Sequence, residues 1–177
     1  MQYGFGVDIG GTTIKIGLFS VDGDLMEKWE IPTNKTDNGK YILTEIADFI
    51  NRTIETKGIE KSDVMGVGLG VPGPVNKNGF VSVCVNLGWN SLNVEKEFHQ
   101  ISGLKVKVGN DANVAALGEM WQGAGKGYQD VLMVTLGTGV GGGCVLNGQI
   151  VSGIHGAGGE IGHMPVRDDE KTPCNCG

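Results

Sequence analysis

The sequence lacks long apolar runs, clusters of basic residues and a leader pattern, and each absence argues against a class of protein. No stretch approaches the roughly 18 apolar residues that a membrane-spanning helix needs. The formal net charge is −6 and no run of lysine or arginine occurs, which argues against a nucleic-acid-binding surface. The amino terminus shows no signal-peptide pattern. We therefore expect a cytoplasmic protein with neither a membrane nor a nucleic-acid partner.

Cysteine is scarce, and its four positions are Cys84, Cys144, Cys174 and Cys176. A disulfide framework is not expected in the cytoplasm. Cys84 and Cys144 are predicted to be buried apolar thiols, since free cysteine behaves as a small hydrophobic residue. The closely spaced pair Cys174 and Cys176 is typical of half a metal site.

Glycine, in contrast, is abundant: 32 of 177 residues, or about 18%, against roughly 7% in average proteins. The glycines stand between runs of valine, isoleucine and leucine, which indicates turns and close backbone approaches rather than a flexible linker. With 40% hydrophobic and 19% charged residues, the chain has the composition of a globular protein with a core.

Two glycine-rich hairpins, at residues 7–19 and 134–146, share one plan: an apolar strand, a turn of glycine and threonine, and a second apolar strand. Such a turn directs backbone N–H groups into one concavity, which suits phosphate oxygens. A single glycine turn is weak support, and neither has the Gly-Lys-Ser/Thr ending of a Walker loop. Their repetition favours two similar halves around a nucleotide. The predicted phosphate-binding residues are Gly10, Gly11, Thr12 and Thr13 in the first turn and Gly137, Thr138 and Gly139 in the second.

Asp8 precedes the first turn, where a carboxylate could hold Mg²⁺ through water; the alternative is a polar residue that merely ends a strand.

Hydrophobic periodicity predicts a mixed α/β chain. Strands are expected at 3–9, 14–20, 25–31, 64–71 and 104–108, and helices at 40–57, 95–102 and 111–121. Met120 and Trp121, at helical spacing, are expected in the core. The glycine-rich segment 122–129 is the expected seam between an amino-terminal α/β domain, residues 1–121, and an incomplete second domain, residues 122–177.

Asp111, at the predicted junction of a strand and a helix, allows two interpretations. A carboxylate there can cap the helix. It also lies at the carboxyl end of a strand, where α/β sheets place their ligands, and could accept the proton of an attacking hydroxyl. The two interpretations are compatible.

Glu160 and His163 lie three residues apart among glycines, so one helical turn would present both side chains on one side. Polar groups that converge in this way can bind sugar hydroxyls. His163 also stands upstream of Cys174 and Cys176, which gives three of the four ligands of a tetrahedral zinc site. Asn86 and Trp89 could place an amide and an aromatic ring at a pocket mouth, or serve packing alone.

In combination these motifs resemble the ROK family of sugar kinases and repressors, and within it the bacterial glucokinases. The resemblance spans residues 7–177. Its strongest segments are 8–15 (DIGGTTIK), 70–75 (GVPGPV), 86–89 (NLGW), 110–119 (NDANVAALGE), 136–143 (LGTGVGGG), 156–163 (GAGGEIGH) and 174–177 (CNCG).

The resemblance implies an actin-like (ribonuclease-H-like) fold of two lobes, the amino-terminal one complete and the carboxyl-terminal one partial. It implies ATP with Mg²⁺ between the hairpins and phosphorylation of glucose at its 6-hydroxyl, with Asp111 as general base. It further implies a homodimer and a structural zinc ion. The implied sugar-binding residues are Asn86, Asn110, Asp111, Glu160 and His163, and the implied zinc ligands are His163, Cys174 and Cys176.

The sequence departs from the family pattern at its end, where the family continues with a further cysteine, a second sugar-binding glutamate and most of the second lobe. We therefore expect residues 1–177 alone to be a poor kinase. Alternative functions are a kinase of another hexose (N-acetylmannosamine, fructose or allose) and a non-catalytic sugar-binding or regulatory protein. The family's repressors carry a helix-turn-helix before the first hairpin, and because Asp8 is the eighth residue of this sequence we do not expect one here.

Overall fold

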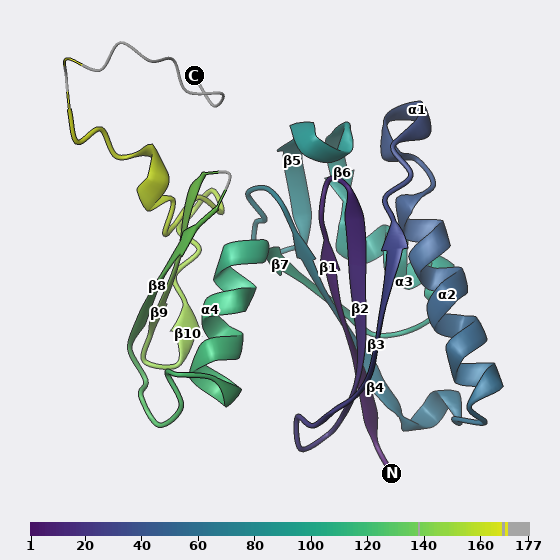
Figure 1. The fold of residues 1–177 in the computed structure, drawn as a ribbon. Helices are drawn as coiled ribbons and strands as arrows, with labels where there is room; N and C mark the ends of the chain where they lie inside the picture. Colours follow the sequence, from purple (N-terminus) through teal and green to yellow (C-terminus); the bar gives the residue numbers. More distant parts are fainter. Residues whose placement is uncertain (138, 168, 170–177) are drawn as a thin grey trace.

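The computed structural model describes residues 1–137, 139–167 and 169 (Figure 1). A five-stranded sheet in the order β3-β2-β1-β4-β7 forms its larger part. β1 runs parallel to β4 and β4 parallel to β7, whereas β2 pairs antiparallel with both β1 and β3. The strands are β1 (Tyr3–Ile9), β2 (Thr13–Ser20), β3 (Leu25–Pro32), β4 (Val64–Val71) and β7 (Val106–Asn110).

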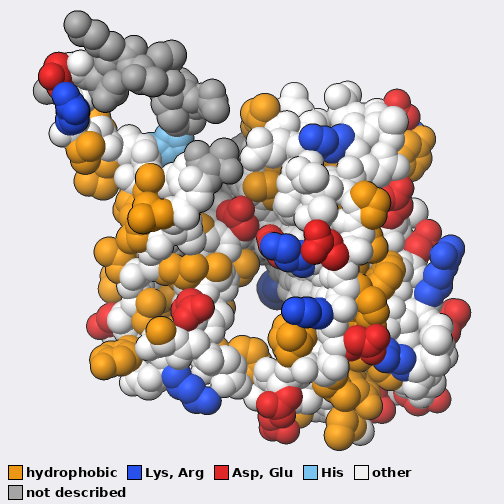
Figure 2. Space-filling view, in the orientation of Figure 1, with side chains coloured by type: hydrophobic (Ala, Val, Ile, Leu, Met, Phe, Trp, Pro, Cys, Tyr) orange, Lys and Arg blue, Asp and Glu red, His pale blue; other side chains and the backbone are white. Residues whose placement is uncertain are grey.

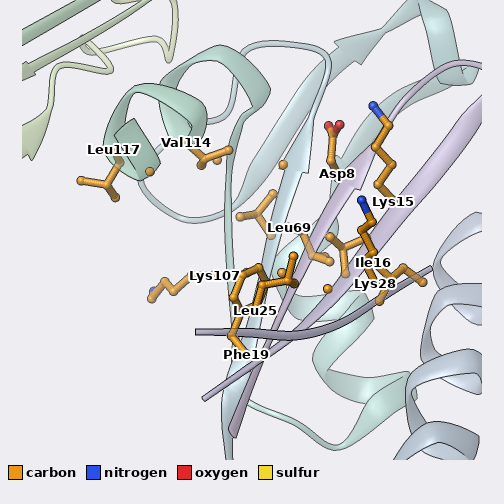
Figure 3. Close-up of a pocket in the computed structure, with 18 of the residues that line it drawn as sticks. Asp8, Lys15, Ile16, Phe19, Leu25, Lys28, Leu69, Lys107, Val114 and Leu117 are labelled. Atoms are coloured by element: carbon orange, nitrogen blue, oxygen red, sulfur yellow. The ribbon is translucent and has the colours of Figure 1, made fainter. Parts of the chain in front are cut away.

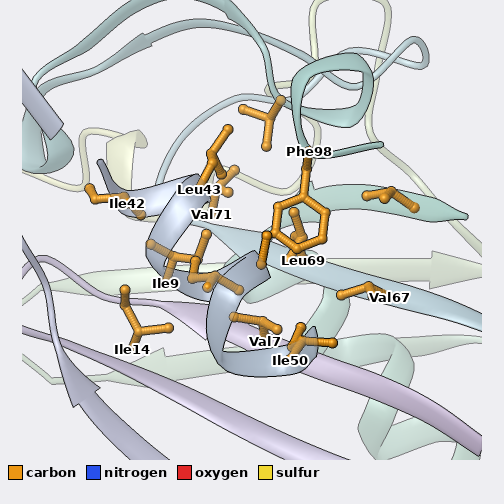
Figure 4. Close-up of a cluster of buried hydrophobic side chains, with 14 of the residues drawn as sticks. Val7, Ile9, Ile14, Ile42, Leu43, Ile50, Val67, Leu69, Val71 and Phe98 are labelled. Carbon is orange, nitrogen blue, oxygen red and sulfur yellow. The ribbon is translucent and has the colours of Figure 1, made fainter. Parts of the chain in front are cut away.

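One face of this sheet carries the hydrophobic core, against α2 (Ile42–Thr56) and α3 (Val94–Ser102). Alternate strand residues such as Val7, Ile9 and Leu69 point into this face, as the period of two in a strand requires. Phe98 of α3 is fully buried among them (Figure 4). Each such side chain contributes about 1.5–3 kcal/mol through removal from water, so this face accounts for much of the stability of the sheet.

The opposite face of the same sheet is built largely from glycine. Gly6 is paired with Gly17 on β2 and with Gly68 on β4, and Gly70 is paired with Gly109 on β7. Register partners point to the same side of a sheet, so these glycines share one face. Much of the glycine excess therefore serves an open sheet surface, in addition to the turns.

The short turn α1 (Thr36–Gly39) precedes α2, and η1 (Lys61–Asp63) precedes β4. Between β4 and α3 lies a small hairpin of β5 (Phe80–Cys84) and β6 (Trp89–Asn93), joined by η2 (Val85–Leu87). Sequence patterns did not predict this hairpin, because its five-residue strands carry polar residues and lack a sustained alternation. The strands and helices that the sequence did predict are all present, although β7 begins two residues later than expected and ends at Asn110.

A second sheet, in the order β10-β9-β8, contains the second glycine hairpin. α4 (Asp111–Gln122) lies between this sheet and the first one and packs mainly on β9 (Figure 1). Gly143 permits this approach, because a Cβ there would lie 2.4 Å from the carbonyl oxygen of Ala112. The strands are β8 (Val131–Leu136), β9 (Val140–Leu146) and β10 (Gln149–Ile150), and η3 (Ile161–His163) follows.

The predicted domain division after residue 121 stays a prediction, and α4, which it assigns to the first domain, contacts the second sheet. No helix within the described ranges is both long and apolar enough to cross a membrane.

Candidate functional site

The first glycine turn joins β1 to β2 and is held by a backbone hydrogen bond of its own and by the side chain of Thr33. The N–H of Gly10 donates to the carbonyl of Thr13 at 3.0 Å, and the hydroxyl of Thr33 donates to the carbonyl of Gly10 at 2.7 Å. Within the described part of the chain, the N–H groups of Gly11 and Thr12 donate to no other residue. The turn thus has a fixed shape and free donors, as a phosphate-binding turn requires.

The second turn joins β8 to β9, and in Figure 1 it lies at the same end of the molecule as the first turn and the start of α4. The N–H of Gly137 donates to the carbonyl of Gly139 at 2.9 Å. A Cβ at either glycine would meet no described atom within 4 Å, so this backbone is open to a ligand. Thr138 lies outside the described residues.

The start of α4 resolves the two interpretations of Asp111. Asn110, not Asp111, is the N-cap: its side-chain oxygen accepts the N–H of Asn113 at 3.1 Å. The amide group of Asn110 also donates to the carbonyl of Gly73 at 3.3 Å, which ties the cap to the loop after β4. Asp111 is the first helical residue, and its Oδ1 accepts the N–H of Ala112 at 2.8 Å. The interpretation of Asp111 as a cap is therefore wrong, and its carboxylate is available for chemistry.

The environment of Asp111 shifts its ionisation. Burial raises the pKa of its carboxyl above the ordinary value of 3.8, and the negative charge of Asp8 raises this pKa further. Hydrogen bonds from Ala112, from its own backbone and from Asn110 act in the opposite direction. A carboxylate with a raised pKa is a better proton acceptor, which suits a general base.

The exposed Asn86 lies beside the first turn. A Cβ added at Gly11 would lie 3.5 Å from the carbonyl oxygen of Asn86. The neighbouring Trp89 is buried instead, and its ring N–H donates to the carbonyl of Gly39 at 3.1 Å. Of the two residues considered for a pocket mouth, only Asn86 is therefore placed to serve there, and Trp89 belongs to the core.

Glu160 and His163 face each other across the single turn of η3, as their spacing predicted. Nε2 of His163 lies 3.9 Å from a carboxylate oxygen of Glu160, and the two side chains are 60% and 34% exposed. Both can therefore reach a ligand from solvent.

The loop that carries Glu160 packs against three other parts of the site. A Cβ at Gly156 would lie 2.5 Å from the carbonyl oxygen of Val75, and one at Gly142 of β9 would lie 2.6 Å from that of Gly159. A Cβ at Gly159 would lie 3.4 Å from the side-chain oxygen of Asn113 on α4. Glycine is thus required where the loop meets β9 and the loop after β4, and at Gly159 the loop also lies beside α4.

The predicted zinc ligands Cys174 and Cys176 lie outside the described residues, and only His163 can be placed. Within the described ranges, no three histidine, cysteine, aspartate or glutamate side chains gather to hold a metal.

A cavity of about 1170 Å³ separates the glycine face of the first sheet from α4 (Figure 3). In Figure 2 it is the hollow between the two sheets. Asp8 and Lys15, opposite each other on β1 and β2, lie together at one end of it. Phe19, Leu117 and Trp121 contribute apolar walls. Trp121 is 53% exposed, so the prediction that it belongs to the core is wrong.

Two residues near Asp111 were not predicted as part of the site. Cys84 is buried and free, and its thiol donates to the carbonyl of Pro72 at 2.9 Å; burial raises its pKa, and the charge of Asp111 adds to this. Asn113 is 3% exposed. Only its place three residues after Asn110 in the motif 110–119 could have indicated it.

Comparison with known proteins agrees with this geometry. The model of the ROK family matches residues 4–177. A glucokinase from Halalkalibacterium halodurans is 49% identical over 173 residues, which cover 97% of this chain and 52% of that protein. An N-acetyl-D-glucosamine kinase from Haemophilus influenzae is 38% identical over 163 residues, which cover 92% of this chain and 52% of that protein. The chain thus spans about half the length of the curated relatives it matches.

Among solved structures, a ROK family glucokinase from Streptomyces griseus in complex with glucose and AMPPNP is similar with a TM-score of 0.77 and 35% identity. The match covers 94% of this chain and 52% of that one. This likeness confirms the predicted actin-like, ribonuclease-H-like fold class.

Proposed function

The chain belongs to the ROK family, and from this premise we propose that it forms the part of an ATP-dependent hexose kinase that carries the catalytic base. The proposed reaction is transfer of the γ-phosphoryl group of ATP to the 6-hydroxyl of glucose. The observation that supports it most is the carboxylate of Asp111. It is partly buried, does not serve as the helix cap, has a raised pKa, and lies at the end of the molecule where both glycine turns lie.

In this mechanism Asp111 accepts the proton of the sugar hydroxyl as that oxygen attacks phosphorus, and the ADP oxygen leaves in line. The free N–H groups of the first turn, at Gly11 and Thr12, donate to phosphate oxygens. Gly10 and Thr13 hold that turn in shape, and Gly137, Thr138 and Gly139 offer the matching turn. Mg²⁺ bound with ATP would neutralise phosphate charge, and Asp8 would hold it through water.

The sugar would be bound by side chains from both sides of Asp111. Glu160 and His163 contribute a carboxylate and an imidazole from the η3 turn. Asn86 contributes an amide beside the first glycine turn. The amide of Asn110 is already engaged as the cap, so its contribution to the sugar would come through its remaining hydrogen-bonding capacity.

An imidazole has two ring nitrogens, so His163 can bind a hydroxyl through one and a metal through the other. We propose that His163, Cys174 and Cys176 hold a zinc ion, which when bound would brace the sugar loop.

The function is tested by a coupled assay for glucose-dependent ADP release by the full-length gene product, alongside Asp111→Ala. We expect turnover from the unaltered protein and a loss of about 10²- to 10⁴-fold in the variant, the usual contribution of a general base. Full turnover by the variant would refute the assignment of the base. Residues 1–177 alone are expected to turn over far more slowly than the full-length product.

Substrate choice is tested over a panel of glucose, N-acetylglucosamine, N-acetylmannosamine, fructose and allose. The 49% identity to a glucokinase supports glucose, and the 38% identity to an N-acetyl-D-glucosamine kinase supports an acetylated sugar less strongly. Calorimetry without ATP separates a kinase from a non-catalytic sugar-binding protein, which would bind a sugar and never release ADP.

We further propose that the protein works in the cytoplasm as a homodimer, without a nucleic-acid or membrane partner. A location in the cytoplasm fits the use of ATP and the free thiols of Cys84 and Cys144 among the described residues. Light scattering tests the dimer.

A further inference from the structure

The side chain of Asn113 is buried without a use that the fold explains. Asn113 is 3% exposed, and its Oδ1 is the one buried side-chain nitrogen or oxygen atom among the described residues that has no hydrogen-bond partner. The cap of α4 does not need this oxygen, because the N–H of Asn113 is already bound by Asn110. A buried acceptor without a donor carries a desolvation penalty, so an apolar side chain of the same shape would suit this conformation better.

Backbone N–H groups that could donate to this oxygen are found in the neighbouring loop, at Gly159 and Glu160. A Cβ at Gly159 would lie 3.4 Å from Oδ1 of Asn113, so the backbone of the loop passes directly beside the amide. In this loop the N–H of Gly158 donates to Ser152 and the N–H of Ile161 to Gly159. Within the described ranges, the N–H groups of Gly159 and Glu160 donate to no residue. The loop beside this unused acceptor therefore carries two unused donors.

We propose that Asn113 is a positioning residue whose amide oxygen accepts a backbone N–H of Gly159 or Glu160 when sugar is bound. This inference rests on the proposed function. A sugar that contacts Glu160 and Asp111 together draws the loop toward α4, and the bond to Asn113 fixes the distance between them. Gly159 has φ +86°, which lets the chain turn there. A Cβ on Gly159 would lie 3.3 Å from the carbonyl oxygen of Gly142 and 3.5 Å from the nitrogen of Cys144, so β9 is close enough to limit the movement to a small shift.

The test uses the full-length gene product with Asn113→Leu, which keeps the shape and removes the acceptor, and Asn113→Asp, which keeps an acceptor oxygen. Measured at pH 8, glucose affinity by calorimetry and the KM for glucose should weaken about 3- to 10-fold in Asn113→Leu, the worth of one hydrogen bond. The KM for ATP should not change, and Asn113→Asp should retain most of the affinity.

The sugar-free Tm of Asn113→Leu should equal or exceed that of the unaltered protein, because the variant removes an unpaired buried amide. A merely structural role predicts the opposite: a lower Tm and an unchanged glucose affinity. Thr53→Val is the matched control, since it deletes a buried hydroxyl that donates to Phe49 on α2, on the other face of the first sheet. It should lower Tm and leave glucose affinity unchanged.

Hydrogen exchange in the unaltered protein tests the same bond without a variant. Glucose should slow exchange of the amide of Gly159 or Glu160, and unchanged exchange at both would overturn the proposal, as would unchanged glucose affinity in Asn113→Leu. Failure of the proposed function and failure of the role of Asn113 give different results. A full-length protein that binds no hexose contradicts the proposed function, whereas hexose binding that Asn113→Leu leaves intact contradicts only the role of Asn113.

Discussion

Asp111 shows how position within one turn of helix decides what a residue can do. The side chain of Asn110 satisfies the orphan N–H of Asn113, so the carboxylate one residue later is not needed as a cap. Burial and the charge of Asp8 then raise its pKa. Asn110 thus caps the helix, and the carboxylate of Asp111 stays available for the proposed proton transfer.

Asp111→Asn should stabilise the fold while it removes the base. A carboxyl whose folded pKa lies above its unfolded value binds its proton more tightly in the folded state. Its contribution to stability is therefore full below the unfolded pKa and is lost as pH rises through the raised one. At neutral pH the neutral amide should raise the free energy of unfolding by roughly 0.5–2 kcal/mol, measured by urea denaturation. At pH 3 this gain should vanish; a gain that persists there would show another cause.

Asp8→Asn should move the acid limb of the pH profile of kcat/KM to lower pH. Removal of the charge of Asp8 lowers the pKa of Asp111, so kcat/KM of the full-length product should retain its plateau to lower pH than in the unaltered protein. The plateau itself should fall if Asp8 also holds Mg²⁺ through water. Asp48→Asn, an exposed carboxylate on α2, is the control and should leave the limb in place. An unmoved limb in Asp8→Asn would argue against coupling of the two carboxylates.

At the scale of elements, α4 is the part on which the site depends. Its first turn carries Asn110, Asp111 and Asn113, and its length separates the second sheet from the glycine face of the first (Figure 1). Glycine on both sheets lets backbone approach closely, as Gly143 does against Ala112. The carboxyl end of β7 therefore places the proposed base, and the packing of α4 fixes its direction.

Two helix caps allow the dependence of the site on α4 to be tested with a matched pair of variants. Asn110 caps α4 and Asn93 caps α3, where its side chain accepts the N–H of Lys96 at 2.8 Å. Asn110→Ala and Asn93→Ala should each lower the free energy of unfolding by about 1 kcal/mol. Only Asn110→Ala should also lose roughly 10- to 100-fold in kcat/KM, because Asp111 loses its position and the sugar loses the proposed contact with Asn110. Equal activity of both variants would contradict the dependence on α4.

At the scale of the whole molecule, the outer face of the second sheet is apolar and, among the described residues, exposed along β8, whereas the Gly159 loop packs on part of β9. Leu132, Val134 and Leu136 of β8 share this face with Val140 of β9, and all four are exposed. The hydrophobic side chains gathered over this sheet are visible in Figure 2. Contiguous apolar surface of this kind favours association.

Residues 1–177 expressed alone should therefore self-associate in a way that depends on this face. The double substitution Leu132→Lys and Leu136→Lys should shift the mass measured by light scattering toward a monomer. Met65→Lys removes an exposed apolar side chain from the first sheet and should leave association unchanged. Association that survives the double substitution would place the contact elsewhere.

Local pattern was sufficient for much of the fold and for the choice of candidate residues. Apolar strands around glycine turns identified both hairpins, an apolar run identified β4, and helical spacing identified α2, because these signals are properties of residues close together in the sequence. The spacing of Glu160 and His163 placed them on one turn for the same reason. The short β5–β6 hairpin was not found, because its strands are short and contact segments distant in the sequence, α3 and Val75 in the loop after β4.

Consecutive residues were enough to indicate the ROK resemblance, the two turns and Asp111 as the candidate base. It took the folded chain to show that Asn110 rather than Asp111 caps α4, that Trp121 lies at a cavity wall, and that the oxygen of Asn113 is buried without a hydrogen-bond partner beside the Gly159 loop. The physical reason is that burial, desolvation and hydrogen-bond partners come from segments far apart along the chain, which only the folded packing brings into contact.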